Sequence, residues 1–147
     1  MIKINKLPKN ILDKIPTLTE LIRADKEVIA FYIFGSAATG RLNPLSDLDF
    51  AVLLHQKLSK TEIFEKNLEL IGVISEHLKT EEFDLIILNN APQRFVHNIL
   101  KTGKLQFCKD REFLIDFIEK NNKMYLDFRY FRDQYDEIFL KRMSHFG

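Results

Sequence analysis

The stretch GSAATGRLNPLSDLD, residues 35–49, joins two apolar runs and decides the fold. The run before it is VIAFYIF at residues 28–34, and the run that overlaps its end is LDFAVLL at residues 48–54. Short runs rich in β-branched and aromatic residues, bounded by turn signals, predict buried β-strands. Asn43-Pro44 marks a turn-rich connection between them. We therefore expect two strands joined by a polar loop.

Two carboxylates lie at the start of the second run. Because side chains alternate along a strand, Asp47 and Asp49 are expected on the same face, about 6.6 Å apart along the chain. Such a pair is costly unless a cation neutralises it or one carboxyl takes up a proton. Mg²⁺ binds oxygen ligands of this kind together with substrate phosphates. The pair is therefore a candidate metal site.

A third carboxylate, Asp84, stands second in the apolar run of residues 83–88, which we interpret as another strand. If this strand is a neighbour of the second one, Asp84 joins the face of Asp47 and Asp49. Three carboxylates can hold two ions for in-line displacement at phosphorus. The alternative is an acid of an edge strand that faces solvent.

Gly35 and Ser36 precede the loop. Glycine permits a close approach of the backbone, and Ser36 opens a predicted short helix whose free N–H groups, together with the hydroxyl, suit a phosphate. A turn glycine and a helix-capping serine are the ordinary roles of these residues, and both are compatible with phosphate binding.

The rest of the chain alternates helical and strand-like stretches, which predicts one mixed α/β domain without an internal boundary. Helical periodicity, capping residues and apolar runs predict the following elements: a broken helix over 8–25, a helix from the capping box at Ser59-x-x-Glu62 to about Lys79, a helix over 93–102, a strand over 105–108 and a helical segment over 110–143.

Composition excludes several classes of function. The net charge of +1 gives no basic field for binding nucleic acid through counterion release. The single cysteine, Cys108, cannot form an internal disulfide and suits a reducing cytoplasm. The longest apolar run has seven residues, whereas a membrane-spanning helix needs about 20. The four histidines lack zinc-site spacing. We expect a cytoplasmic protein without membrane or direct nucleic-acid contacts.

The spacing of Gly35-Ser36, ten residues, and Asp47-x-Asp49 resembles the hallmark of the polymerase-β-like nucleotidyltransferases, especially their minimal nucleotidyltransferase (MNT) branch. The later carboxylate of that family, in a short hydrophobic strand, matches Asp84. The resemblance covers about residues 20–110. It implies a nucleotidyltransferase fold, with a mixed sheet of four or five strands flanked by helices. Residues 1–147 then form a single domain with a C-terminal helical extension over about 111–145.

The resemblance also implies roles for these residues. Asp47, Asp49 and Asp84 would bind two Mg²⁺ ions and carry catalysis, with Asp84 near the attacking hydroxyl. Gly35-Ser36 would hold the triphosphate of ATP. We expect the active face at the exit of the first three strands.

Two residues of the connecting loop, Arg41 and Ser46, are further candidates for nucleotide contacts. The sequence does not choose which cation touches phosphate.

The short, single-domain chain is similar to stand-alone MNT antitoxins paired with HEPN-family RNase toxins, which transfer AMP from ATP to a tyrosine of the toxin. Our main hypothesis is such a protein adenylyltransferase with a HEPN toxin as partner. Two alternatives stay open: a small-molecule nucleotidyltransferase of the aminoglycoside-modifying kind, and a catalytically silent MNT antitoxin that acts by occlusion. The toxin itself is disfavoured, because Arg94 and His97 lack the Arg-x(4–6)-His spacing of HEPN proteins.

The last third of the chain carries an aromatic stripe at helical spacing, from Leu114 through Phe117 and Tyr125 to Phe139. Such a stripe usually packs against its own domain. Its tyrosine and arginine content is also typical of protein interfaces, so part of it is a candidate docking segment.

Overall fold

The computed structural model describes residues 11–35, 48–55 and 58–124 of the chain. The elements in chain order are η1 (Ile11–Lys14), α1 (Ile15–Arg23), β1 (Val28–Phe34), β2 (Leu48–Leu54), α3 (Lys60–Leu78), β3 (Phe83–Ile87), η2 (Leu88–Asn90), α4 (Gln93–Thr102) and β4 (Lys104–Cys108). Residues 111–124 form a further helix.

The four described strands form one mixed sheet in the order β3-β2-β1-β4. β1 is antiparallel to both β2 and β4, whereas β2 and β3 are parallel. β1 and β2 have the bounds expected from their apolar runs, and the mixed sheet flanked by helices confirms the predicted fold class. β3 ends one residue early because Leu88 already belongs to η2.

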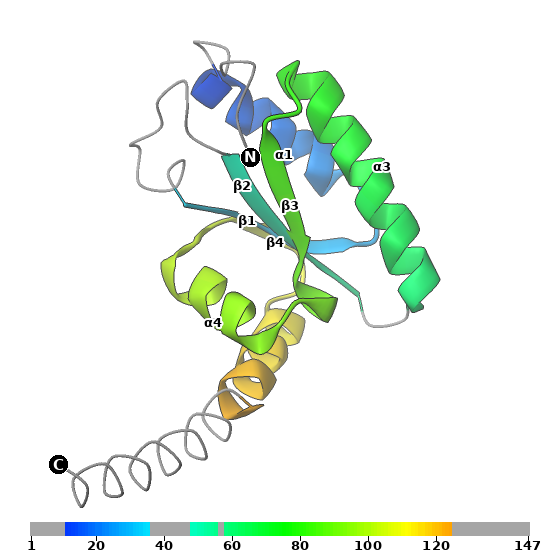
Figure 1. The fold of residues 1–147 in the computed structure, drawn as a ribbon. Helices are drawn as coiled ribbons and strands as arrows, with labels where there is room; N and C mark the ends of the chain where they lie inside the picture. Colours follow the sequence, from blue (N-terminus) through cyan, green and yellow to red (C-terminus); the bar gives the residue numbers. More distant parts are fainter. Residues whose placement is uncertain (1–10, 36–47, 56–57, 125–147) are drawn as a thin grey trace, which may run out of the picture.

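Helices cover both faces of the sheet (Figure 1). Alternation along β2 divides its side chains between two clusters. Leu48 and Phe50 pack with α1 and α3 in the first cluster. Ala51 and Leu53 pack with α4 and the helix of residues 111–124 in the second. The sheet is therefore the middle layer of three, and odd-numbered residues of β2 share the α4 face.

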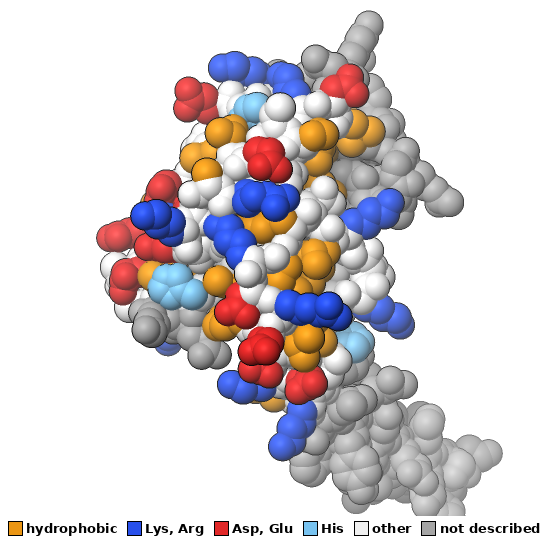
Figure 2. Space-filling view, turned by 180° about the vertical axis from the view of Figure 1, so that it is seen from behind, with side chains coloured by type: hydrophobic (Ala, Val, Ile, Leu, Met, Phe, Trp, Pro, Cys, Tyr) orange, Lys and Arg blue, Asp and Glu red, His pale blue; other side chains and the backbone are white. Residues whose placement is uncertain are grey.

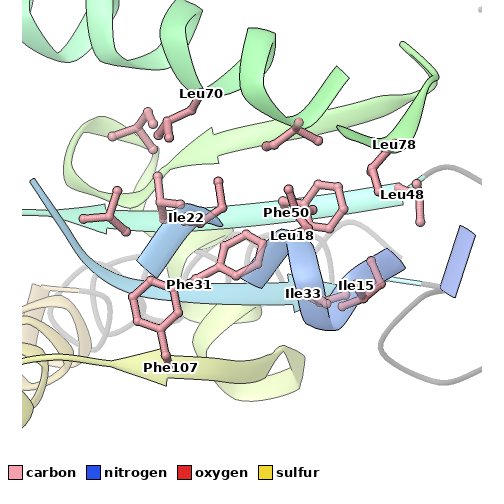
Figure 3. Packing of buried hydrophobic residues seen from close by; sticks show 14 of the residues in the cluster. Ile15, Leu18, Ile22, Phe31, Ile33, Leu48, Phe50, Leu70, Leu78 and Phe107 are labelled. Atoms are coloured by element: carbon pink, nitrogen blue, oxygen red, sulfur yellow. The ribbon is translucent and has the colours of Figure 1, made fainter. Parts of the chain in front are cut away.

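Aromatic rings form the centre of the first cluster (Figure 3). Phe31 of β1 stacks on Phe50 of β2 with ring centroids 5.7 Å apart, and Phe107 of β4 lies 6.1 Å from Phe31. Leu18 and Ile22 of α1 close over these rings with no exposed surface. Burying each such side chain stabilises the fold by about 1.5–3 kcal/mol, so these contacts help to hold β2, β1 and β4 together.

The helix α3 begins at the predicted capping box. The Ser59 side chain accepts a hydrogen bond from the Glu62 N–H at 3.2 Å, and the Glu62 carboxylate accepts one from the Ser59 N–H at 3.2 Å. The helix ends at Lys79 in the left-handed conformation, with φ of 58°. Its buried residues are Ile63, Leu70, Ile74 and Leu78.

The side-chain amide of Asn89 pairs with the backbone at the end of β2, as a neighbouring strand would. The Leu54 N–H donates to Oδ1 of Asn89 at 2.8 Å, and Nδ2 of Asn89 donates to the Leu54 carbonyl at 2.6 Å. Both backbone groups of Leu54 are thus satisfied beyond the last paired residue of β3.

The final described helix starts where the sequence indicates. Oδ1 of Asp110 accepts a hydrogen bond from the Phe113 N–H at 3.0 Å, which makes Asp110 the N-cap. The helix runs without a break through Asn121 and Asn122. Leu114, with Phe117 beside it, packs into the second cluster, as expected of a core stripe. The rest of the aromatic stripe, from Tyr125 onward, lies outside the described residues.

The surface carries charges of both signs. Figure 2 shows acidic, basic and apolar side chains interspersed on the face behind that of Figure 1. Among the helices of the described segments, none is both long enough and apolar enough to cross a membrane.

Candidate active site

Two of the three predicted catalytic carboxylates meet at one end of the sheet. Asp49, second in β2, pairs with Phe34 at the end of β1 on one side and with Asp84 of β3 on the other. Directly paired residues of neighbouring strands project from the same face. Asp49 and Asp84 therefore stand side by side on the α4 face, as predicted for neighbouring strands.

Among the described residues, the helices of the α4 face do not cover this end of the sheet. β2 and β3 both begin at the top of Figure 1, whereas α4 and the helix of residues 111–124 cover the α4 face at the bottom. Asp49 is half-buried and Asp84 is exposed. Among the described strands, β3 is also one of the two edge strands of the sheet. Asp84 is thus an exposed acid of an edge strand, which was one of the two expectations from the sequence. It also shares a face with Asp49, which was the other.

The expected position of the active face is wrong in one respect. The site lies at the exit of β1 but at the entrances of β2 and β3, not at the exits of all three strands. The reason is that β2 runs antiparallel to β1, and β3 runs parallel to β2.

Gly35 packs against the carboxylate of Asp49. Its φ of 72° is in the left-handed region, which L-residues with side chains rarely adopt. A Cβ atom added to Gly35 would lie 3.3 Å from Cγ of Asp49 and would collide with Oδ2. Glycine is therefore required here twice, for the turn out of β1 and for the room that the carboxylate occupies.

Four of the predicted site residues, Ser36, Arg41, Ser46 and Asp47, lie outside the described residues. Within the described segments, no group of three or more histidine, cysteine, aspartate or glutamate side chains is arranged to hold a metal ion. Asp49 and Asp84 supply two carboxylates on one face of the sheet, and carboxylate oxygens are the ligands that Mg²⁺ prefers. These two side chains thus fit the ligand type of a magnesium site, although they do not complete one among the described residues.

The sequence interpretation missed an apolar strip on α3, one end of which, Leu68, lines the same hollow as Asp84. Leu68 is 55% exposed and Phe64 is 62% exposed, on the outer side of α3. Their spacing of four residues places them on one helix face. Phe64 and Leu68 form an apolar i, i+4 pair beside the buried stripe of Ile63, Leu70, Ile74 and Leu78, and this pair is the signal in the sequence for the strip.

Comparison with known proteins extends these observations. Residues 16–112 match the family model described as polymerase beta, nucleotidyltransferase. The chain belongs to this family. The match includes Gly35, Asp49 and Asp84, and the resemblance inferred from the motif spacing is confirmed. The chain is therefore a nucleotidyltransferase.

One curated relative of this chain is the protein adenylyltransferase MntA of Aphanizomenon flos-aquae (strain 2012/KM1/D3). It is 30% identical over 109 residues, which cover 65% of this chain and 71% of the relative.

Solved structures confirm the fold of the family member. A structure of a toxin–antitoxin with AMP-PNP has a chain with a TM-score of 0.65 and 23% identity, over 86% of this chain and 95% of that one. A structure of the tri-AMPylated Shewanella oneidensis HEPN toxin in complex with MNT antitoxin has a chain with a TM-score of 0.59 and 21% identity, over 86% and 93%.

Proposed function

We propose that this protein is an Mg²⁺-dependent adenylyltransferase that moves AMP from ATP to a tyrosine of a cognate HEPN-family toxin and so acts as its antitoxin. The observation that carries the proposal is the direct pairing of Asp49 with Asp84 on one face of the sheet, beside Gly35. The protein adenylyltransferase named among its relatives supports the type of acceptor. The AMPylated HEPN toxin found with an antitoxin of this fold supports the partner.

Asp49 and Asp84, with Asp47, would hold the ions. Magnesium, when bound, neutralises the phosphates of ATP and the charge that develops during transfer. Asp84, on the edge strand, faces the side from which an acceptor hydroxyl can arrive, and its carboxylate takes the proton of that hydroxyl. The tyrosine oxygen forms a bond to the α-phosphorus as the bond to the β-phosphate oxygen breaks, and pyrophosphate leaves.

Gly35 and Ser36 belong to the other half of the proposed site. Gly35 brings the backbone at the end of β1 next to Asp49. A triphosphate held by the Gly35-Ser36 segment would then lie against the metal-binding carboxylates. Arg41 and Ser46 are proposed as additional phosphate contacts. The protein would thus work mainly by positioning and charge neutralisation, without a covalent intermediate.

The test is AMP transfer to the purified cognate HEPN toxin in the presence of Mg-ATP, followed by intact mass and by mapping of the modified residue. We expect a mass increase of one or more AMP units on a tyrosine. Asp49→Asn and Asp84→Asn should each slow transfer by at least about 100-fold, because stabilisation of the developing charge is lost.

The matched control is Asp116→Asn, an exposed carboxylate of the helix of residues 111–124, which should transfer AMP at the wild-type rate. Transfer that persists in both site variants would contradict the proposal. Neutralisation of the toxin without any nucleotide adduct would favour occlusion. Adenylylation of an aminoglycoside, with the toxin unmodified, would favour the small-molecule alternative.

A further inference from the structure

A crevice runs along the outer side of the sheet between α3 and β3, which lie side by side in Figure 1. It consists of two hollows that share Leu85. The hollow nearer the candidate active site has a volume of about 530 Å³ and includes Leu68, Gly72 and Asp84 in its lining. The other has a volume of about 300 Å³ and includes Phe64 and Asn67. The crevice therefore leads from an apolar region of α3 to a proposed catalytic carboxylate.

One wall of the crevice is the free edge of a strand. Among the described residues, β3 pairs only with β2, so its other edge has no strand partner. Alternate residues of a strand direct their N–H and C=O groups to opposite edges. An extended polypeptide can satisfy such groups by adding a strand, which is a common way to bind peptides.

Two further observations indicate a polypeptide ligand. Phe64 and Leu68 expose more than half of their side chains beside this edge, which gives apolar anchors next to backbone hydrogen-bonding groups. Oδ1 of Asn67 is buried and has no hydrogen-bond partner within the described part of the chain. An incoming backbone or side-chain N–H would satisfy this acceptor.

The charges of the crevice select the ligand further. The charged residues in its lining are Glu81 and Asp84, both acidic and both at the end near the active site. Because Asp84 would bind Mg²⁺ in the proposed active site, Glu81 carries the charge that favours a lysine or arginine near the reacting residue.

The alternation of side chains along β3 determines which residues of such a segment would face Asp84 and which would enter the crevice. Leu85 of β3 packs toward α3, with the first cluster, whereas Asp84 shares the opposite face with Asp49. A strand added to the edge would alternate in the same way. A residue that presents its side chain to Asp84 would have neighbours at positions −1 and +1 that enter the crevice.

We propose that the crevice between α3 and β3 is the docking site for the acceptor segment, which binds as an additional strand on β3 and presents its tyrosine to Asp84. The segment carries apolar residues immediately before and after that tyrosine and a basic residue nearby. The proposal rests on the proposed function and adds to it where the protein substrate binds and what sequence it has.

The first test measures steady-state AMP transfer to the cognate HEPN toxin by the double variant Phe64→Ala/Leu68→Ala. We expect the KM for the toxin to rise about tenfold or more, with kcat and Mg-ATP affinity within about twofold of wild type, because only docking contacts are removed. Leu21→Ala, which truncates a 47% exposed leucine of α1, is the matched control and should leave all three values unchanged.

The second variant separates docking from folding. A Cβ atom at Gly72 meets no atom within 4 Å, and glycine is a poor helix residue, so Gly72→Gln should fold at least as well as wild type while its side chain fills the crevice. We expect the same rise in KM as for the double variant, with a melting temperature that is not lowered. Glu65→Gln, an exposed position of the same helix, is the control.

Amide hydrogen exchange gives a readout that does not depend on catalysis. Addition of the toxin without ATP should protect the amides of residues 83–87. An unchanged KM in Gly72→Gln, or protection confined to α4 and β4, would overturn the docking proposal. So would a wild-type dimer that the double variant converts to a monomer without change in KM. If the wild type adds no AMP to the toxin at all, the proposed function is wrong, and the docking proposal that rests on it falls with it.

Discussion

Gly35 packs against the Asp49 carboxylate, so a single carbon atom added at Gly35 should displace that carboxylate. We expect Gly35→Ala to lose about 1–3 kcal/mol of unfolding free energy through the strain of the left-handed backbone. It should also lose most AMP transfer, because its Cβ displaces the carboxylate. Urea unfolding and the transfer assay measure the two effects separately.

Asparagine at the same position distinguishes strain from collision. Gly35→Asn tolerates the positive φ better than alanine does, so it should recover part of the lost stability. Its Cβ meets Asp49 in the same way, and activity should stay low. Wild-type activity in Gly35→Asn would show that the close approach is unimportant.

At the scale of single elements, the start of α3 depends on reciprocal hydrogen bonds between Ser59 and Glu62. Ser59→Ala removes the acceptor for the Glu62 N–H and should lower the unfolding free energy by about 1 kcal/mol. Thr61→Ala, an exposed neighbour in the same turn, should change it by less than about 0.5 kcal/mol. Equal losses in the two variants would mean that the cap does not stabilise the helix.

The elements that the sequence predicts well are those whose signals are local. The capping box marks the start of α3, and apolar runs give both ends of β1 and β2. β4 begins one residue earlier than expected, at Lys104, because an exposed lysine pairs through its backbone with Ile33 and leaves no apolar signal. The relative direction of two strands has no local signal in the sequence either. Side chains alternate in the same way in parallel and in antiparallel strands.

The same distinction applies to the site. Spacing in the sequence predicted that Asp84 would join the face of Asp49 if their strands were neighbours, and the register puts them directly opposite each other. The crevice beside α3 was not predicted, because it depends on which of two apolar helix faces the sheet covers. The sheet covers the face of Leu70, and Leu68 stays outside.

At the scale of the whole molecule, Lys66 joins α3 to the turn between α1 and β1 within the helical layer on one side of the sheet. Its ammonium is 2.9 Å from Asp25 and 3.1 Å from Glu27, in the turn between α1 and β1, and 3.0 Å from Glu69 of its own helix. Burial alone lowers the pKa of Lys66, but hydrogen bonds to these carboxylates outweigh that effect and raise the pKa above its ordinary value.

Removal of this cation should therefore weaken the fold. Lys66→Met leaves three neighbouring carboxylates without their cation, and we expect a loss of about 1–3 kcal/mol in the unfolding free energy at pH 7. Because the pKa is raised on folding, the contribution is complete below the unfolded value of about 10.4 and disappears only as pH rises through the folded value.

Urea titrations of wild type and Lys66→Met at several pH values test this sign. The difference between them should stay constant from about pH 6 to pH 9 and shrink only at higher pH. Lys101→Met, at an exposed lysine of α4, is the control and should differ from wild type by less than about 0.5 kcal/mol. A difference that shrinks already below about pH 9 would contradict the assignment.

The antiparallel return of β2 along β1 also bears on how sequences of this kind can change. Since Phe34 and Asp49 face each other across the two strands, the intervening chain departs and arrives at the same place, whatever its length. Substitutions between Ser36 and Asp47 that keep the ten-residue spacing can therefore alter nucleotide contacts without shifting Asp49 and Asp84, which the paired strands hold. Nucleotide preference can then diverge among relatives while Asp49 and Asp84, the proposed catalytic acids, stay in register.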